Sequence, residues 1–139
     1  YIIVVQETDG SVTPVDLDMN WIVSKKKYDF IGKRALIRSD TVKEDRKQLV
    51  GIITVDPSIV LEEGSQLVEV ETSLPMPMVG HITSSYYSPN LGRSIALALV
   101  KSGTKKKGVK LVVPTVNSSV EVEITNPVFI DPENERLMA

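Results

Sequence analysis

Hydrophobic and polar residues alternate along the second half of the chain at the spacing of β-strands. The clearest example is VEVEIT at 120–125, where valine and isoleucine alternate with glutamate and threonine. A period of two places one face of a strand in a core and the other in water. Further runs rich in β-branched residues predict strands, separated by turn residues, at 48–55, 66–71, 79–84, 94–101 and 109–113.

These runs predict a mainly β domain over residues 48–139, built as a small closed barrel or as a sandwich. We favour a six-stranded antiparallel β-barrel, because an open sheet of this size would leave two unpaired edges.

The first 40 residues follow a different pattern. The opening YIIVVQETDG predicts a strand and a turn, Trp21–Val23 predicts a second short strand, and 28–38 has helical spacing with Asp29 as a possible N-cap. The charged stretch 39–47 lacks periodicity, and within it we place a linker at 41–47. Because chain ends seldom consist of a bare strand, we expect residues 1–40 to be the end of an α+β domain in a longer polypeptide.

Composition narrows the possible partners. Of the 139 residues 42% are hydrophobic and 24% charged, with a net charge of −2 and an isoelectric point near 5.4, so no overall positive field attracts nucleic acid. The absence of cysteine excludes disulfides, thiolate zinc sites and cysteine nucleophiles. The longest apolar run, Ile95–Val100, is much shorter than a bilayer requires. We therefore expect neither a nucleic acid nor a membrane partner.

The segment GHITSSYYSPNLGRSIALALV, at 80–100, contains the single histidine of the chain, His81. A catalytic histidine needs a partner carboxylate or nucleophile, and the sequence spacing identifies none, so a structural role is favoured. The serines of this segment are expected to form hydrogen bonds in a turn. The acidic pairs of the chain lack the spacing of a calcium loop, and no metal site is predicted.

Two runs of three lysines are candidates for anion binding. Lys25–Lys27 follows the predicted tryptophan strand and could contact an anionic ligand tail, or could be a solvated strand end. Lys105–Lys107 lies between glycines and predicts an exposed hairpin loop. The chain contains neither of the glycine-rich phosphate-binding motifs Gly-x-Gly-x-x-Gly and Gly-x-x-x-x-Gly-Lys-Ser/Thr.

The same segment, 80–100, resembles a signature of the glycine-cleavage T-protein (aminomethyltransferase) family. In that signature a Gly-x-x-Thr-Ser strand leads to Ser-Pro-x-Leu and then to Ile-Ala-Leu-Ala-x-Val. Other stretches resemble the family in the same order: IIVVQETDGSVTP, MNWIV, DFIGKRAL, LVGI and ITNPVF. Within the family, IGKRALIRSDTVKEDRKQLVGI is most similar to the sarcosine oxidase α-subunit branch. Dimethylglycine oxidase-like and dimethylglycine dehydrogenase-like enzymes carry the same domain and stay alternatives.

This resemblance implies part of a flavin-dependent amine oxidase. In such enzymes a flavin oxidises an N-methyl amine, and the T-protein-like module binds tetrahydrofolate, which accepts the released one-carbon unit. The chain would supply the end of the middle domain and the C-terminal barrel. Because the resemblance places the family's catalytic aspartate upstream of these residues, the chain alone should be inactive. The resemblance places FAD, FMN and NAD elsewhere in the parent complex. It also implies folate and other sarcosine oxidase subunits as partners, and a cytoplasmic location.

The resemblance also suggests which residues contact folate. Lys25 or Lys26 matches the family's basic group on the benzoyl-glutamate side, Trp21 would pack against the pocket or in the core, and Tyr86, placed at a turn beside Tyr87, would stack on a ligand or on another subunit. No catalytic residue is assigned. The alternatives are a non-catalytic barrel for subunit docking, an aminomethyltransferase of glycine cleavage, or a translation-factor-like barrel, which the acidic isoelectric point disfavours.

Overall fold

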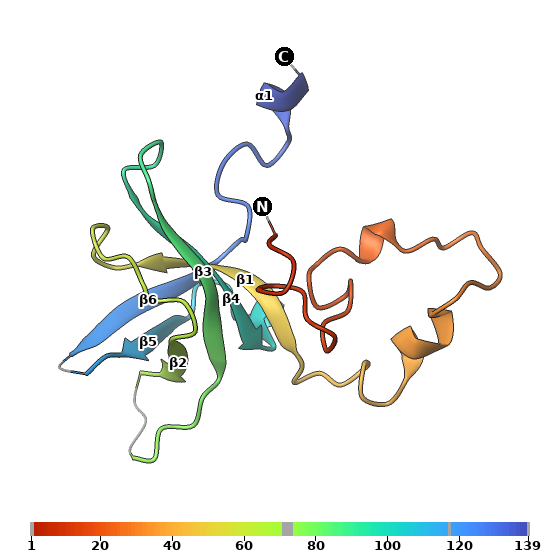
Figure 1. Ribbon diagram of the computed structural model, residues 1–139, viewed down its shortest axis with the longest axis horizontal. Helices are drawn as coiled ribbons and strands as arrows, with labels where there is room; N and C mark the ends of the chain where they lie inside the picture. Colours follow the sequence, from red (N-terminus) through yellow and green to blue (C-terminus); the bar gives the residue numbers. More distant parts are fainter. Residues whose placement is uncertain (1, 71–73, 117, 139) are drawn as a thin grey trace.

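A computed structural model describes residues 2–70, 74–116 and 118–138, and its main feature is a closed β-barrel (Figure 1). Six antiparallel strands pair around the barrel in the order β1-β4-β3-β2-β5-β6. Their bounds are β1 Lys47–Thr54, β2 Gln66–Glu69, β3 Gly80–Ser88, β4 Arg93–Lys101, β5 Lys110–Pro114 and β6 Ser119–Thr125. The predicted six-stranded antiparallel barrel is confirmed; residue 71, the end of one predicted strand, lies outside the described residues.

The barrel interior is filled by branched side chains that alternate along each strand. In β6 Val122 and Ile124 are fully buried, as the alternation of VEVEIT predicts. They belong to one cluster with inward residues of the other strands, among them Val50, Ile52 and Ile82. At about 25 cal/mol per Å² of apolar surface removed from water, this cluster supplies the main stabilisation of the fold.

The β3–β4 hairpin is longer than the sequence suggested. Its register pairs Tyr87 with Ser94 and Ser88 with Arg93, so both tyrosines lie in β3 and the turn is formed by the residues after Ser88. The prediction that the tyrosines lie at the turn is therefore wrong, as is the turn role expected of Ser84 and Ser85. Ser88 does take part in the turn, since its backbone oxygen accepts a hydrogen bond from Leu91 N at 3.2 Å. The three serines are buried in β3, and Ser85 Oγ accepts a hydrogen bond from Leu61 N at 3.1 Å.

The second lysine run also has a different setting from the predicted hairpin loop. It lies in and directly after η3, a 3₁₀ helix at Gly103–Lys106 that leads from β4 to β5, strands that are not neighbours in the barrel. A Cβ atom on Gly103 would lie 2.8 Å from Val50 Cγ1 and 3.0 Å from Gln48 O. Glycine is required here because η3 packs closely against the end of β1.

Residues 2–46, the N-terminal segment, contain little regular structure in their described part. They form an isolated bridge between Val4 and Thr8 and two 3₁₀ helices, η1 at Asn20–Ile22 and η2 at Lys33–Ile37. The two predicted strands are absent there, because no neighbouring strand offers a partner. In place of the helix predicted over 28–38 there is only the 3₁₀ helix η2, which starts at Lys33 after Gly32 with φ 93°. Asp29 is not its N-cap, since Asp29 Oδ1 accepts a hydrogen bond from the adjacent Phe30 N.

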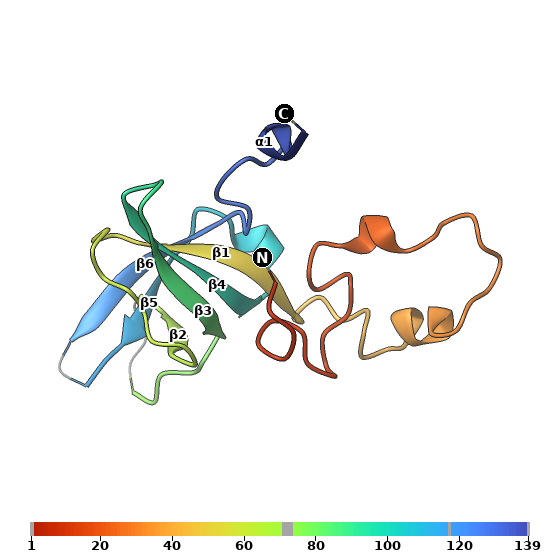
Figure 2. The same cartoon turned by 45° about the horizontal axis from the view of Figure 1, so that its top comes forward.

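The N-terminal segment is fixed to the outside of the barrel. Its first part runs beside β1, and the loop that carries η1 and η2 extends away from the barrel in both views (Figures 1 and 2). Outward side chains of β1 and β4 form an apolar cluster with the two chain ends, made of Leu49, Leu97 and Leu99 together with Ile2, Val12, Leu17 and Phe129. A polar contact adds to this attachment, since Leu49 N of β1 donates a hydrogen bond to the backbone oxygen of Asp16 at 2.7 Å, and an ion pair with Arg46 holds the buried Asp16 side chain within the segment.

The C-terminal residues end in a short helix, α1, at Glu135–Met138. Asp131 precedes it and accepts hydrogen bonds from the backbone N–H groups of Glu135 and Arg136 at 2.8 and 3.0 Å. Across the described ranges, no helix has the length and apolar character needed to cross a bilayer. In the same ranges, no three histidine, cysteine, aspartate or glutamate side chains gather as a metal site would need.

Candidate functional site

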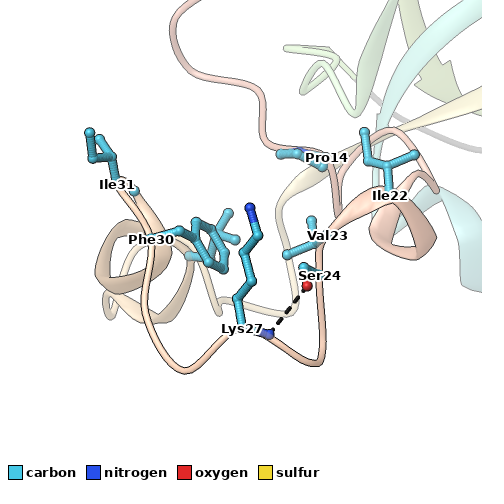
Figure 3. A pocket seen from close by; sticks show the side chains of 9 residues that line it. Pro14, Ile22, Val23, Ser24, Lys27, Phe30 and Ile31 are labelled. Carbon is cyan, nitrogen blue, oxygen red and sulfur yellow. Dashed lines mark hydrogen bonds between the residues drawn. The ribbon is translucent and has the colours of Figure 1, made fainter.

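An apolar pocket of about 440 Å³ lies within the N-terminal segment, between η1 and η2 (Figure 3). All its walls come from one stretch of chain, and most are hydrophobic. The lining residues are Pro14, Ile22, Val23, Ser24, Lys27, Phe30, Ile31, Gly32 and Leu36. We call this cavity the apolar pocket.

Local turns set the shape of the apolar pocket. Ser24 Oγ accepts a hydrogen bond from Lys27 N at 3.3 Å, which closes the turn after η1. Gly32, at φ 93°, then starts η2 and brings Leu36 into the wall. A positive φ of this kind favours glycine, because other residues are strained there.

Lys27 is the only charged residue that lines the apolar pocket. Its side chain points into the space between Phe30 and Val23 (Figure 3). Among the described residues, no hydrogen bond or ion pair engages its Nζ. Lys33 differs, since its Nζ donates to the carbonyl oxygens of Tyr28 and Lys27 and lies 5.9 Å from the Tyr28 ring centre. Lys27 therefore has a free cationic group directed at a hydrophobic cavity.

None of the four site residues predicted from the sequence lines the apolar pocket. Lys25 and Lys26 are exposed and are not part of its lining. Trp21 is 78% exposed, so it is not in the core, and its neighbours Ile22 and Val23 form the wall instead. Tyr86 is half-exposed on β3 of the barrel, opposite Ile95.

The structure therefore does not bring the four predicted residues together. The sequence indicates the run Lys25–Lys27 as a candidate for anion binding but does not single out Lys27, and it does not assign Phe30 to a site. The position of Lys27 in the sequence could have distinguished it, because it is the lysine of the run nearest to the DFIG stretch that begins at Asp29.

The chemistry of the apolar pocket fits binding better than catalysis. No histidine, aspartate or glutamate lines it, so the Ser24 hydroxyl has no adjacent base that would activate it. A flat or aromatic group could lie against Phe30 and Val23 while an anionic group reached the Lys27 ammonium. The pocket thus suits an amphipathic ligand with an apolar body and a negative end.

Comparison with known protein families matches residues 47–131 to the glycine cleavage T-protein C-terminal barrel domain. The chain is 48% identical to the sarcosine oxidase subunit alpha of Corynebacterium sp. (strain P-1), over 98% of this chain and 14% of that protein. It is 36% identical to the aminomethyltransferase of Thermotoga neapolitana, over 93% of this chain and 33% of that protein. The chain thus spans only a small part of the curated relatives that it matches.

A solved structure has the same fold. It is the glycine cleavage system aminomethyltransferase T from Bartonella henselae, with a TM-score of 0.68 over 83% of this chain and 31% of that chain. The sequence identity is 20%, so this likeness concerns the arrangement of the strands.

Proposed function

The chain belongs to the family of the glycine cleavage T-protein C-terminal barrel domain, and on this premise we propose that it completes the tetrahydrofolate-binding module of a sarcosine oxidase α subunit. In this proposal the whole protein is a flavin-dependent oxidase, and the module accepts the one-carbon unit released when sarcosine is demethylated. The observation that carries the proposal is similarity across nearly the entire chain to sarcosine oxidase α subunits, higher than to aminomethyltransferases.

The apolar pocket supports a folate role for the N-terminal segment. Tetrahydrofolate combines flat rings with a glutamate tail, and when bound it supplies the nitrogen atoms that carry a one-carbon unit. In this chain Phe30 and Val23 offer an apolar wall, and Lys27 offers a cation that has no ion-pair or hydrogen-bond partner in the part of the chain that the structure describes. We assign Lys27 to the carboxylate of the benzoyl-glutamate end, in place of Lys25 or Lys26.

The residues of this chain would bind and orient the ligand rather than move its protons. A lysine ammonium attracts a carboxylate as a point charge, without the two-pronged geometry of arginine. Such a contact contributes about 1.5 kcal/mol of binding free energy, or roughly a tenfold change in affinity. Catalytic groups for one-carbon transfer would come from other parts of the whole protein.

Folate binding by the intact polypeptide that carries this sequence tests the proposal. We expect Lys27→Ala to weaken tetrahydrofolate binding about tenfold by calorimetry, because the ligand loses a charged contact. Lys25→Ala is the matched control: it removes the same charge two residues away, outside the lining, and should change affinity less than about twofold.

The two variants distinguish a specific contact of Lys27 with the ligand from an effect of overall charge. Equal weakening by both variants would mean that only overall charge matters and would remove Lys27 from the site. An intact protein that ignores tetrahydrofolate would overturn the folate proposal itself.

A second candidate function is subunit docking by a barrel that binds no folate. The observation in its favour is the exposure of large apolar side chains on the N-terminal segment, where Tyr28 and Ile31 are almost completely solvent-exposed. Contiguous exposed apolar surface commonly marks an interaction site. This candidate predicts no folate binding in the intact protein and loss of subunit assembly when Ile31 is changed to Ser.

A further inference from the structure

A second cavity lies where the N-terminal segment meets the barrel. It has a volume of about 560 Å³ and is walled on one side by residues 9–13 and 35–46, and on the other by β1, β3 and β4. Unlike the apolar pocket, it is lined by several charged groups. These are Asp9, Arg38, Asp40, Arg46, Lys47 and His81. We call it the interface cleft.

Some of these charges are already neutralised within the protein. Arg46 forms a two-pronged ion pair with the buried Asp16, with its Nε and Nη2 2.8 and 2.6 Å from the carboxylate oxygens. Asp40 pairs with Lys43 at 2.8 Å and lies 3.4 Å from Arg46. These four groups therefore leave no net charge to attract a ligand.

The groups that are left carry a net positive charge. Arg38 and Lys47 have no acidic partner within ion-pair distance among the described residues, whereas Asp9 is the one remaining acidic group. The Asp9 carboxylate is already engaged, since Oδ1 accepts hydrogen bonds from Ser11 N and Oγ at 2.7 and 2.6 Å. In the described ranges, the interface cleft thus has two cationic side chains without an ion-pair partner, and one carboxylate that already accepts hydrogen bonds.

His81 adds a switchable charge beside one of those cations. Its Nδ1 lies 3.4 Å from Lys47 Nζ, so the neutral ring can accept a hydrogen bond from the ammonium. Burial lowers the pKa of His81 below the usual 6.5, and the Lys47 charge lowers it further, while Asp9 acts in the opposite direction. Two adjacent nitrogens that would both be positive are a natural place for a shared counter-anion.

We propose that the interface cleft binds a small oxyanion, a phosphate or carboxylate group, between Lys47, Arg38 and the protonated ring of His81. The anion would bridge Lys47 and His81 and so remove the repulsion between them. This site is distinct from the apolar pocket, and it stands whether or not the chain binds folate. It would give His81, unassigned by the proposed function, a role in ligand binding.

Anion binding and protonation of His81 must then favour each other. A ligand that binds the protonated form more tightly raises the pKa of the ring, and by linkage a lower pH tightens ligand binding. If the anion raises that pKa by about 0.5, its affinity below pH 5.5 should exceed that above pH 7.5 about threefold.

The single histidine makes this coupling measurable in the 139-residue chain. The pKa of His81 is followed by NMR of the imidazole C–H and N–H signals, in sulfate and in chloride at equal ionic strength. Sulfate resembles a phosphate group but does not titrate between pH 5 and 8. We expect a pKa below 6.5 in chloride, and a rise of about 0.5 in sulfate. Acetate, tested above pH 6, shows whether a carboxylate binds as well.

Three variants complete the test. Lys47→Met should raise the pKa of His81 in chloride and abolish the sulfate effect, whereas Lys47→Arg should retain that effect. Lys110→Met removes an exposed lysine of β5 and should behave as the unaltered chain does. Dispersed amide signals in the same samples establish folding. Identical titrations in sulfate and chloride, or an undiminished sulfate effect in folded Lys47→Met, would overturn the proposal.

Discussion

Asp16 shows how one residue can fix a loosely structured segment to a barrel. Its side chain is only 2% exposed, and it accepts hydrogen bonds from Arg46, Thr13 N and Thr13 Oγ1. Its backbone oxygen also accepts from Leu49 N of β1 at 2.7 Å. Burial alone would raise the pKa of Asp16, but the hydrogen bonds from Arg46 and Thr13 outweigh it and lower the pKa below the usual 3.8. The charged carboxylate is therefore part of the folded structure.

Arg46→Met should lower the free energy of unfolding by about 3 kcal/mol at pH 7, because it leaves Asp16 buried without its counter-charge. A carboxyl with a lowered pKa stabilises the fold above pH 3.8, and this contribution is lost as the pH falls through the folded-state pKa. Urea unfolding at several pH values measures both effects: the deficit of the variant should shrink below pH 3.8.

The exposed pair Lys43–Asp40 provides the control for this prediction. Its side chains are 58% and 72% exposed, so Lys43→Met should change stability by less than about 1 kcal/mol. A deficit of the Arg46 variant that stays constant down to pH 2.5 would show that the ion pair is not its cause.

At the level of elements, the close packing of β1 against the chain after β6 depends on a glycine, which has no side chain. Gly51 lies in the middle of the strand, opposite Leu97 of β4 and Thr125 of β6. A Cβ atom there would lie 2.1 Å from Asn126 O and 2.9 Å from Phe129 Cζ. The bare surface of β1 therefore lets the chain after β6 cross directly over it.

Gly51→Ala should destabilise the barrel by about 2 kcal/mol or more, because the backbone after β6 must move away from β1. Gly10→Ala is the matched control, since nothing lies within 4 Å of its Cβ position, and it should change stability by less than about 0.5 kcal/mol. Thermal unfolding of both variants makes the comparison, and equal midpoints would contradict the predicted close contact.

The elements that could be predicted from the sequence are the strands in which hydrophobic and polar residues alternate with a period of two. The alternation in 120–125 fixed β6 within one residue, because one face is buried and the other is not. Trp21–Val23 has equally strong β propensity, but Trp21 and Ile22 lie in the 3₁₀ helix η1 and only Val23 is extended, since propensity cannot supply a pairing partner. The choice of Lys27 within the candidate run Lys25–Lys27 was not predictable for a related reason: which of three consecutive lysines faces a pocket depends on a turn closed by Ser24.

At the scale of the whole molecule, a tightly packed barrel carries a sparsely packed segment. The barrel strands bury their hydrophobic residues around one core. The loop between residues 20 and 40 leaves large apolar side chains exposed and is held mainly by short-range hydrogen bonds, such as Ala35 N to Gly32 O. The two parts should therefore differ in local stability.

Amide hydrogen exchange should reveal this difference. We expect the Ala35 amide to exchange at least about 100-fold faster than that of Ala98 in β4, because η2 can open without disturbing the core. The Leu49 amide, bonded to the oxygen of Asp16, should be protected like β4. Protection of Ala35 equal to that of Ala98 would mean that segment and barrel unfold as one unit.

The pairing of β1 with β6 has a consequence for biosynthesis. Ile52 meets Ile124 across this seam, so the cylinder joins the first of its strands to the last. A ribosome makes β1 long before β6, and until the final strand has left the exit tunnel, β1 has an open edge that other chains can reach. A translational pause shortly before the codon for Ser119, the first residue of β6, would prolong that exposure, and nascent chains should recruit chaperones most strongly at that stage.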